Sequence, residues 1–196
     1  MIREDRLGRR RQRNTSQRVG ANSGLAEYEA PAEHRSSPRK IGGRGVSAPY
    51  ILLVEDNRDD EELALVTLGR ISLGHEIVVL RDGADAVDFL WCNGPHVSRD
   101  PILMPVVILL DLKLPKLDGL SVLKHLRSDE RTRHVPIVMW TSSGQESDVA
   151  ASYKLGANSY IRKPVEFGAF VEAISSVGMY WTRLNCAPPS GFDALR

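Results

Sequence analysis

The chain has 196 residues, with 26 Lys and Arg, 25 Asp and Glu and two cysteines, and its net charge is +1. This length suits one domain with a core of ordinary size plus a tail, and the balanced charge points to no particular partner. Cys92 and Cys186 are too few for a disulfide framework or a zinc site. No apolar run approaches the roughly 20 residues of a membrane span, and the N-terminus lacks a secretory signal, so we expect a cytoplasmic protein.

Residues 1–48 differ from the rest of the chain in charge and pattern. They carry 11 basic and 5 acidic residues, whereas residues 49–196 carry 15 and 20. Scattered Ser, Asn, Pro and Gly with almost no apolar periodicity predict a disordered basic tail. Such an arm could contact nucleic acid or an acidic partner. The alternatives are a solvated tail without a partner, or a translation start placed too early in the gene.

From Pro49 onward, five short apolar runs alternate with helical patterns. A helical pattern follows each run, and Asn57 or Asp59 can cap the first of them. This alternation predicts an α/β fold with a doubly wound, five-stranded parallel sheet in the order 2-1-3-4-5. The irregular stretch 93–105 is the one long connection. The expected strands are residues 50–54, 77–80, 106–110, 135–139 and 159–161.

Polar side chains follow four of these runs at the point where each strand ends. Glu55 and Asp56 follow the first strand, Asp111 the third, Thr141 the fourth and Lys163 the fifth. The carboxyl ends of parallel strands share one edge of a sheet, so these side chains can converge. Three carboxylates together need a compensating cation, and magnesium prefers such oxygen ligands. The set predicts phosphoryl transfer to a carboxylate, with an acyl phosphate intermediate.

These motifs together resemble the response-regulator receiver domain, the flavodoxin-like phospho-acceptor of two-component signalling. The similarity covers about residues 50–176, and it is specific because four motifs occur in order, each at a strand end. The long loop and the aromatic C-terminal extension look most like the stand-alone regulators of bacterial phytochromes. The motifs are Leu53-Val54-Glu55-Asp56-Asn57, Leu110-Asp111-Leu112-Lys113-Leu114-Pro115 with Asp118-Gly119, Trp140-Thr141-Ser142, and Lys163-Pro164.

The resemblance implies a role for each acidic residue. Asp111 would be the nucleophile that takes a phosphoryl group from a sensor histidine kinase, which for a phytochrome would make light the signal. Asp56 would coordinate Mg²⁺ directly, with Asp111, and Glu55 would act largely through bound water. The backbone carbonyl of Lys113 would supply a further ligand.

The resemblance also implies roles for the remaining polar residues. Lys163 would pair with the phosphoryl oxygens, and the Thr141 hydroxyl and the Ser142 N–H would bind them. Tyr160 stands where the family has an aromatic switch that moves with Thr141. The bond between Lys163 and Pro164 is expected to be cis.

Two residues depart from the usual pattern of the family. Lys113 is a long cation two residues past Asp111, where the side chain influences how fast the acyl phosphate hydrolyses. Trp140 is bulkier than the usual aliphatic residue before Thr141.

The C-terminal part suggests how the signal leaves the protein. We expect a receiver domain over residues 49–183 and a tail over 184–196. About 20 residues after the last helix of the domain are too few for a DNA-binding or catalytic output domain, so we expect output by contact with a downstream protein. Apolar residues every three to four positions up to about Arg183 predict either a partner or homodimer site, or packing on the chain's own domain.

Two other functions remain open at this level. One is an interaction module that does not depend on phosphorylation. The other is a magnesium-dependent phosphatase with an aspartyl nucleophile, which usually has a second Asp two residues later, where this chain has Lys113. The receiver interpretation predicts a phospho-acceptor that is not an enzyme, although it catalyses its own phosphotransfer and dephosphorylation.

Overall fold

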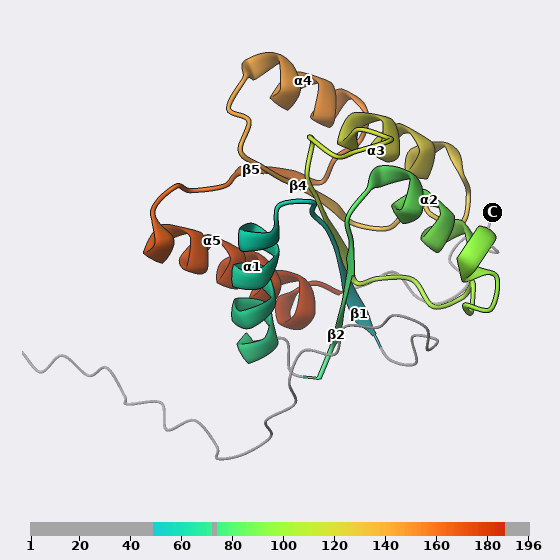
Figure 1. The fold of residues 1–196 in the computed structure, drawn as a ribbon, viewed down its shortest axis with the longest axis horizontal. Helices are drawn as coiled ribbons and strands as arrows, with labels where there is room; N and C mark the ends of the chain where they lie inside the picture. The colour runs from blue at the N-terminus through green and yellow to red at the C-terminus, as the bar shows by residue number, and fades with distance from the viewer. Residues whose placement is uncertain (1–48, 72–73, 187–196) are drawn as a thin grey trace, which may run out of the picture. The chain divides into compact units, whose positions relative to one another are not determined.

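Five short strands form one parallel sheet in the computed structural model, which describes residues 49–71 and 74–186 (Figure 1). Their order is β2-β1-β3-β4-β5, which confirms the predicted fold class. β1 and β3 lie in the middle and consist of buried residues only, as the continuous apolar runs require. The strands are β1 (Tyr50–Val54), β2 (Glu76–Leu80), β3 (Val107–Leu110), β4 (Ile137–Thr141) and β5 (Ser159–Arg162).

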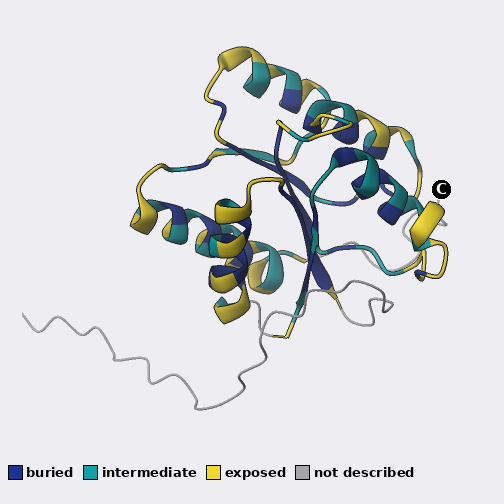
Figure 2. Cartoon of the chain, viewed as in Figure 1, coloured by how far each residue is buried: buried dark blue, intermediate teal, exposed yellow. Residues whose placement is uncertain are grey.

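Helices cover both faces of this sheet. α1 and α5 pack together on one face, and α2, α3 and α4 lie toward the other (Figure 1). Alternate residues of β1 point to opposite faces, so Leu52 joins the α2–α3 core and Leu53 the α1–α5 core. The central strands are buried, and the helices turn exposed sides outward (Figure 2). The helices are α1 (Arg58–Ile71), α2 (Gly83–Trp91), α3 (Gly119–Ser128), α4 (Glu146–Lys154) and α5 (Phe167–Met179), with the 3₁₀ turn η1 (Gly94–His96) and the π-helical turn η2 (Tyr180–Leu184).

The predicted bounds of the fourth strand were wrong. β4 begins at Ile137 instead of residue 135 and runs on to Thr141, because Pro136 has no N–H for the ladder and the Val135 carbonyl accepts from Arg127. In α1, Ala64 and Leu68 are buried, whereas Val66 is 44% exposed.

The loop between α2 and β3 is anchored by a buried arginine that the sequence did not reveal. Arg99 is 5% exposed, and its guanidinium donates to the Tyr50 hydroxyl and to the Leu103 carbonyl. The guanidinium carbon also lies 4.6 Å from the centre of the Phe89 ring. Burial raises the pKa of Tyr50 to about 12, although Arg99 opposes the shift, so the phenol stays protonated. Arg99 therefore ties the loop to the first residue of β1.

The C-terminal helix divides its apolar side chains between core and surface. Phe170 and Ile174 are buried, and Trp181 packs partly against the α1–α5 core. Tyr180 and Leu184 stay exposed at 49% and 72%. The expected packing of this helix on its own domain therefore holds for Phe170, Ile174 and Trp181, and the partner or homodimer site stays a prediction.

Two further expectations concern the ends of the chain and the membrane. Residues 1–48, and residues 187–196 of the expected C-terminal tail, lie outside the described residues. Among the helices that the structure describes, none has the length and apolar character to cross a membrane.

Gly119 holds the loop that follows β3 in a tight path. Its N–H donates to the Leu112 carbonyl at 2.9 Å. A Cβ atom on Gly119 would lie 2.1 Å from the carbonyl oxygen of Asp111 and 2.9 Å from the Cα of Leu112. Because those atoms belong to the backbone, they cannot yield by a rotamer change. A glycine at this position therefore fixes the backbone that carries Asp111.

We expect Gly119→Ala to lower the free energy of unfolding by about 2–3 kcal/mol, because the added methyl group overpacks the loop. Gly144→Ala is the matched control, since its Cβ would meet only the flexible side chain of Arg162 at 3.1 Å. Urea unfolding of the two variants measures the difference. An equal, small effect of both substitutions would contradict the packing argument.

Candidate functional site

The ends of β1 and β3 bring three carboxylates together. The Asp111 N–H donates to the Val54 carbonyl at 3.1 Å, so Asp111 lies beside the end of β1. Glu55 and Asp56 follow directly on that strand. Side-chain oxygens of Glu55, Asp56 and Asp111 all lie within 4.8 Å of one another. Glu55 and Asp111 are buried and Asp56 is exposed, so the cluster opens to solvent on the side of Asp56.

Lys163 reaches into this cluster from the end of β5. Its side chain is 5% exposed, and its ammonium donates to Glu55 Oε2 at 2.5 Å and to Asp111 Oδ2 at 3.2 Å. A third bond of 2.9 Å goes to Asp60 Oδ2, on the first turn of α1. An ammonium group has three donors, and each of them has a carboxylate partner here. The Lys163 N–H donates to the Thr141 carbonyl at 2.7 Å, which fixes the backbone from which the side chain extends.

Burial and charge act against each other in the site. Burial raises the pKa of Glu55 to about 7, and the charge of Lys163 opposes this shift. For Lys163, burial alone would lower the pKa, but the charge and hydrogen bond of Glu55, the charge of Asp111 and the hydrogen bond to Asp60 together raise it. The lysine therefore remains an ammonium ion, and it is the buried countercharge for the carboxylates.

The carboxylate of Asp111 is held at both oxygens. Oδ1 accepts from the Leu112 N–H at 2.6 Å, and Oδ2 accepts from Lys163. The side chain is 8% exposed. The orientation of the Asp111 carboxylate is thus fixed, and it lies among the charged groups of this site. This arrangement suits a nucleophile.

The donor set fits a magnesium ion. Two oxygens bound to one octahedral Mg²⁺ lie at most about 4.2 Å apart, since each bond is about 2.1 Å. The cluster spans up to 4.8 Å. A small closure, or a water molecule between the ion and one carboxylate, brings it into this range. Carboxylate oxygens and water are the ligands that this ion prefers.

The predicted switch residues lie at the ends of β4 and β5. Thr141 is fully buried, and its hydroxyl oxygen accepts from the Ser143 N–H at 3.3 Å. Ser142 is exposed. The Tyr160 hydroxyl donates to the Ser143 carbonyl at 3.0 Å, and burial raises the pKa of this tyrosine. Thr141 and Tyr160 therefore contact the same short loop from two strands.

The structure corrects the expected form of the peptide bond between Lys163 and Pro164, and it shows where the large side chain of Trp140 lies. The described residues contain no cis peptide bond, so the bond between Lys163 and Pro164 is trans, the form that is favoured by about 0.5–1 kcal/mol before proline. Trp140 is fully buried and packs edge to face against Phe170, with ring centres 5.1 Å apart. The large ring is thus accommodated on the α5 side of the sheet.

Sequence reasoning missed one partner of Lys163. Asp60 lies in the acidic first turn of α1, and its carboxylate also binds Lys163. The available signal was its position, because the first turn of a helix that directly follows β1 lies next to the carboxyl edge.

Lys113 lies two residues past Asp111 with an exposed side chain.

Comparisons with known proteins agree with this geometry. The family model of the response regulator receiver domain matches residues 51–175. The chain is 36% identical over 138 residues to the response regulator Rcp1 of Synechocystis sp., which covers 70% of this chain and 92% of Rcp1.

Solved structures of phytochrome response regulators are also similar. The phosphorylated cyanobacterial phytochrome response regulator RcpA aligns with a TM-score of 0.68 and 33% identity, over 73% of this chain and 100% of RcpA. The bacteriophytochrome response regulator RtBRR aligns with a TM-score of 0.58 and 51% identity, over 76% of this chain and 90% of RtBRR. A Mn²⁺-bound form of Rcp1 aligns with a TM-score of 0.68 and 34% identity, over 72% of this chain and 100% of Rcp1. With five parallel strands in the order 2-1-3-4-5 and a matching family model, this chain belongs to the response regulator receiver domain family of two-component signalling proteins.

Proposed function

We propose that Asp111 accepts a phosphoryl group from a sensor histidine kinase, and that the phosphorylated domain signals by contact with another protein. The observation that carries this proposal is the environment of Asp111. Its carboxylate is buried and fixed between the Leu112 N–H and the Lys163 ammonium, beside the carboxylates of Glu55 and Asp56. Members of this family are in general signal transducers and not enzymes. The exposed Lys113, in place of a second carboxylate, argues against an aspartyl phosphatase.

The transfer itself requires one bond to form and one to break. A carboxylate oxygen of Asp111 attacks phosphorus, while the bond between phosphorus and the kinase imidazole nitrogen breaks. The electron pair of that bond stays with the imidazole, which then takes a proton from solvent. Lys163 lies within reach of the incoming phosphoryl oxygens and offsets their charge. A magnesium ion held by Asp56, Asp111 and the Lys113 carbonyl, with Glu55 acting through water, would neutralise further negative charge when bound.

Activation would then rearrange the loop after β4. The Thr141 hydroxyl and the Ser142 N–H are the nearest predicted donors for the phosphoryl oxygens. Movement of Thr141 toward the phosphoryl oxygens would change the 3.3 Å contact in which its hydroxyl oxygen accepts from the Ser143 N–H. Ser143 also accepts from the Tyr160 hydroxyl, so movement of this loop changes the hydrogen bond that holds the tyrosine. The pair of contacts supports Thr141 and Tyr160 as coupled switch residues.

The relatives support a particular kind of kinase. RcpA and RtBRR are phytochrome response regulators, and they are 33% and 51% identical to this chain. A phytochrome histidine kinase in the cytoplasm is therefore the partner that we propose. Light would be the input signal in that case.

Incubation with magnesium and acetyl phosphate is expected to add one phosphoryl group to the wild-type protein, measured as the intact mass. Asp111→Asn and omission of magnesium should both abolish the adduct, because the first removes the nucleophile and the second leaves the charge of the phosphoryl group uncompensated. Glu62→Gln, an exposed carboxylate on α1, is the control that keeps it. An adduct that persists in Asp111→Asn would contradict the assignment.

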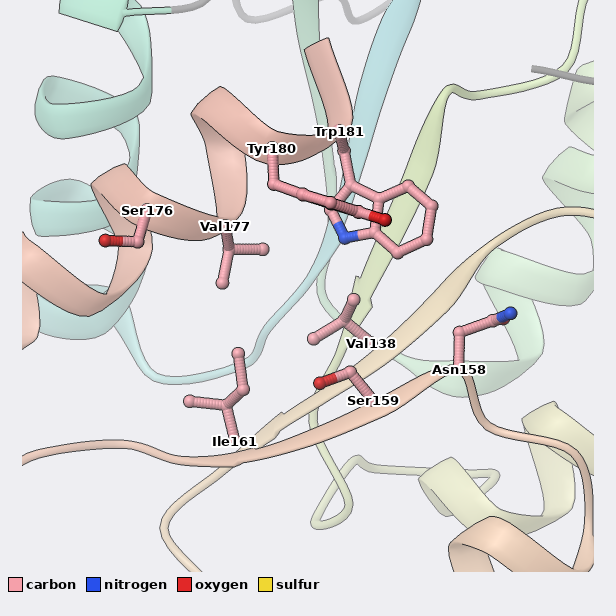
Figure 3. Close-up of a pocket in the computed structure, with 8 residues that line it drawn as sticks. All are labelled: Val138, Asn158, Ser159, Ile161, Ser176, Val177, Tyr180 and Trp181. Carbon is pink, nitrogen blue, oxygen red and sulfur yellow. The ribbon is translucent and has the colours of Figure 1, made fainter. Parts of the chain in front are cut away.

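An open groove beside β5 is the surface that we propose for output. It has a volume of about 560 Å³ and lies between β4 and β5 on one side and the end of α5 with η2 on the other. In Figure 3, Val138, Ile161 and Val177 face the same space, and Tyr180 lies at its border in edge-to-face contact with Trp181. The hollow is partly apolar, and a two-fold axis beside it would bring the half-exposed Tyr180 ring of one copy to the hollow of the other. The occupant that we propose is therefore a second copy of this chain.

Tyr180→Ser is expected to weaken this homodimer about tenfold, because it removes a half-exposed aromatic side chain from the contact. Light scattering after gel filtration, over a range of concentrations and with or without beryllium fluoride, measures the dimer. Tyr153→Ser changes an exposed tyrosine on α4 and is the matched control. A wild-type protein that remains monomeric throughout would assign the groove to a different partner and would contradict the dimer.

A further inference from the structure

Asp60 is the one partner of Lys163 that the proposed chemistry leaves without a role. Its Oδ2 accepts from the Lys163 ammonium at 2.9 Å, and its side chain is 30% exposed. Glu55 and Asp111 belong to the carboxylate cluster itself, but Asp60 reaches the ammonium from the first turn of α1. The contact joins residues 103 positions apart in the chain.

The position of Asp60 is set by the cap of α1. The side-chain oxygen of Asn57 accepts from the N–H of Asp59 at 2.9 Å and from the N–H of Asp60 at 3.2 Å. The Asn57 N–H in turn donates to Glu55 Oε1 at 3.2 Å. The end of β1, the cap and the first turn of α1 therefore form one connected unit. Asp60 extends from a fixed backbone and not from a mobile loop.

The three contacts of Lys163 determine where its ammonium lies. The bond to Glu55 is the shortest at 2.5 Å, and the bond to Asp111 is the longest at 3.2 Å. A lysine side chain is a flexible four-carbon stem, so two contacts leave its ammonium free to pivot toward the nearer carboxylate. A third contact on another element removes this freedom. Asp60 thus restricts where the ammonium lies relative to Glu55 and Asp111.

We propose that Asp60 is a positioning residue for phosphoryl transfer, because it holds the Lys163 ammonium where it meets the phosphoryl group on Asp111. This role rests on the proposed function of Asp111. Asp60 itself need not touch the phosphoryl group, and it acts only through Lys163.

A purely structural role for Asp60 would have a different origin. A carboxylate in the first turn stabilises a helix by interacting with its positive N-terminal end. Asp59 is the neighbouring residue in the same first turn of α1, and its side chain is exposed. The Lys163 contacts of the structure include Asp60 but not Asp59. Asp59 is therefore a matched control for the effect of the helix end.

The first experiment measures the phosphorylation rate of the full chain with acetyl phosphate at saturating magnesium. We expect Asp60→Ala to slow phosphorylation about fivefold to tenfold, which is the loss of one charge-assisted hydrogen bond at a partly exposed site. Asp60→Asn keeps an acceptor oxygen, so it should recover part of the rate. Asp59→Ala should leave the rate unchanged. Equal slowing by Asp59→Ala and Asp60→Ala would overturn the proposal.

The second experiment repeats Asp60→Ala in a Lys163→Met background, where the stem is kept and the ammonium is lost. We expect no additional slowing there, because Asp60 has nothing left to position. The double-mutant cycle of Asp60→Ala and Lys163→Met can also be measured by thermal unfolding without metal, which does not depend on activity. There too we expect the effects of the two substitutions not to add. Equal slowing by Asp60→Ala in the wild-type and Lys163→Met backgrounds would overturn the positioning role of Asp60 but leave the proposed function of Asp111 standing. A wild-type protein that gains no phosphoryl group would instead contradict the proposed function.

Discussion

The contact of one buried ammonium with three carboxylates is the interaction on which the site depends. Lys163 binds Glu55 directly after β1, Asp60 in the first turn of α1 and Asp111 directly after β3. Each carboxylate would be costly to bury without a cation, and the cation would be costly to bury without them. The charge of the lysine therefore joins the end of β5 to the ends of β1 and β3, in addition to the hydrogen bonds between the strands. A phosphoryl group on Asp111 would change the charge balance of the whole cluster.

The rest of the fold keeps these groups in register. β1 and β3 are buried throughout, so their ends cannot shift relative to each other without exposing core side chains. Gly119 holds the loop after Asp111 against its own backbone. Thr141 is the last residue of β4, and the contact of its hydroxyl with the Ser143 N–H in the following loop is a weak one, because it is long at 3.3 Å. A fixed nucleophile beside a loop that can rearrange is a physical basis for a switch.

Much of this arrangement could be predicted from the sequence, because its main signals are local. A buried strand followed directly by a polar residue is visible in the chain, and the parallel order of the strands brings Glu55, Asp111 and Lys163 to one edge. The contact of Asp60 was missed, since the helix end alone explains an acidic residue there and its position beside the carboxyl edge names no partner. Arg99 was missed for a similar reason: a loop arginine is usually exposed, and only the tertiary structure shows its contact with Tyr50.

The most direct test of the account is to locate the modified residue chemically. An acyl phosphate on an aspartate is reduced by borohydride to homoserine, and the mass of the proteolytic peptides then identifies the position. The account predicts homoserine at residue 111 after incubation with a phytochrome histidine kinase, ATP and magnesium, and unmodified Asp56, Asp59 and Asp60. Reduction at one of those other aspartates, with Asp111 unchanged, would contradict the central claim.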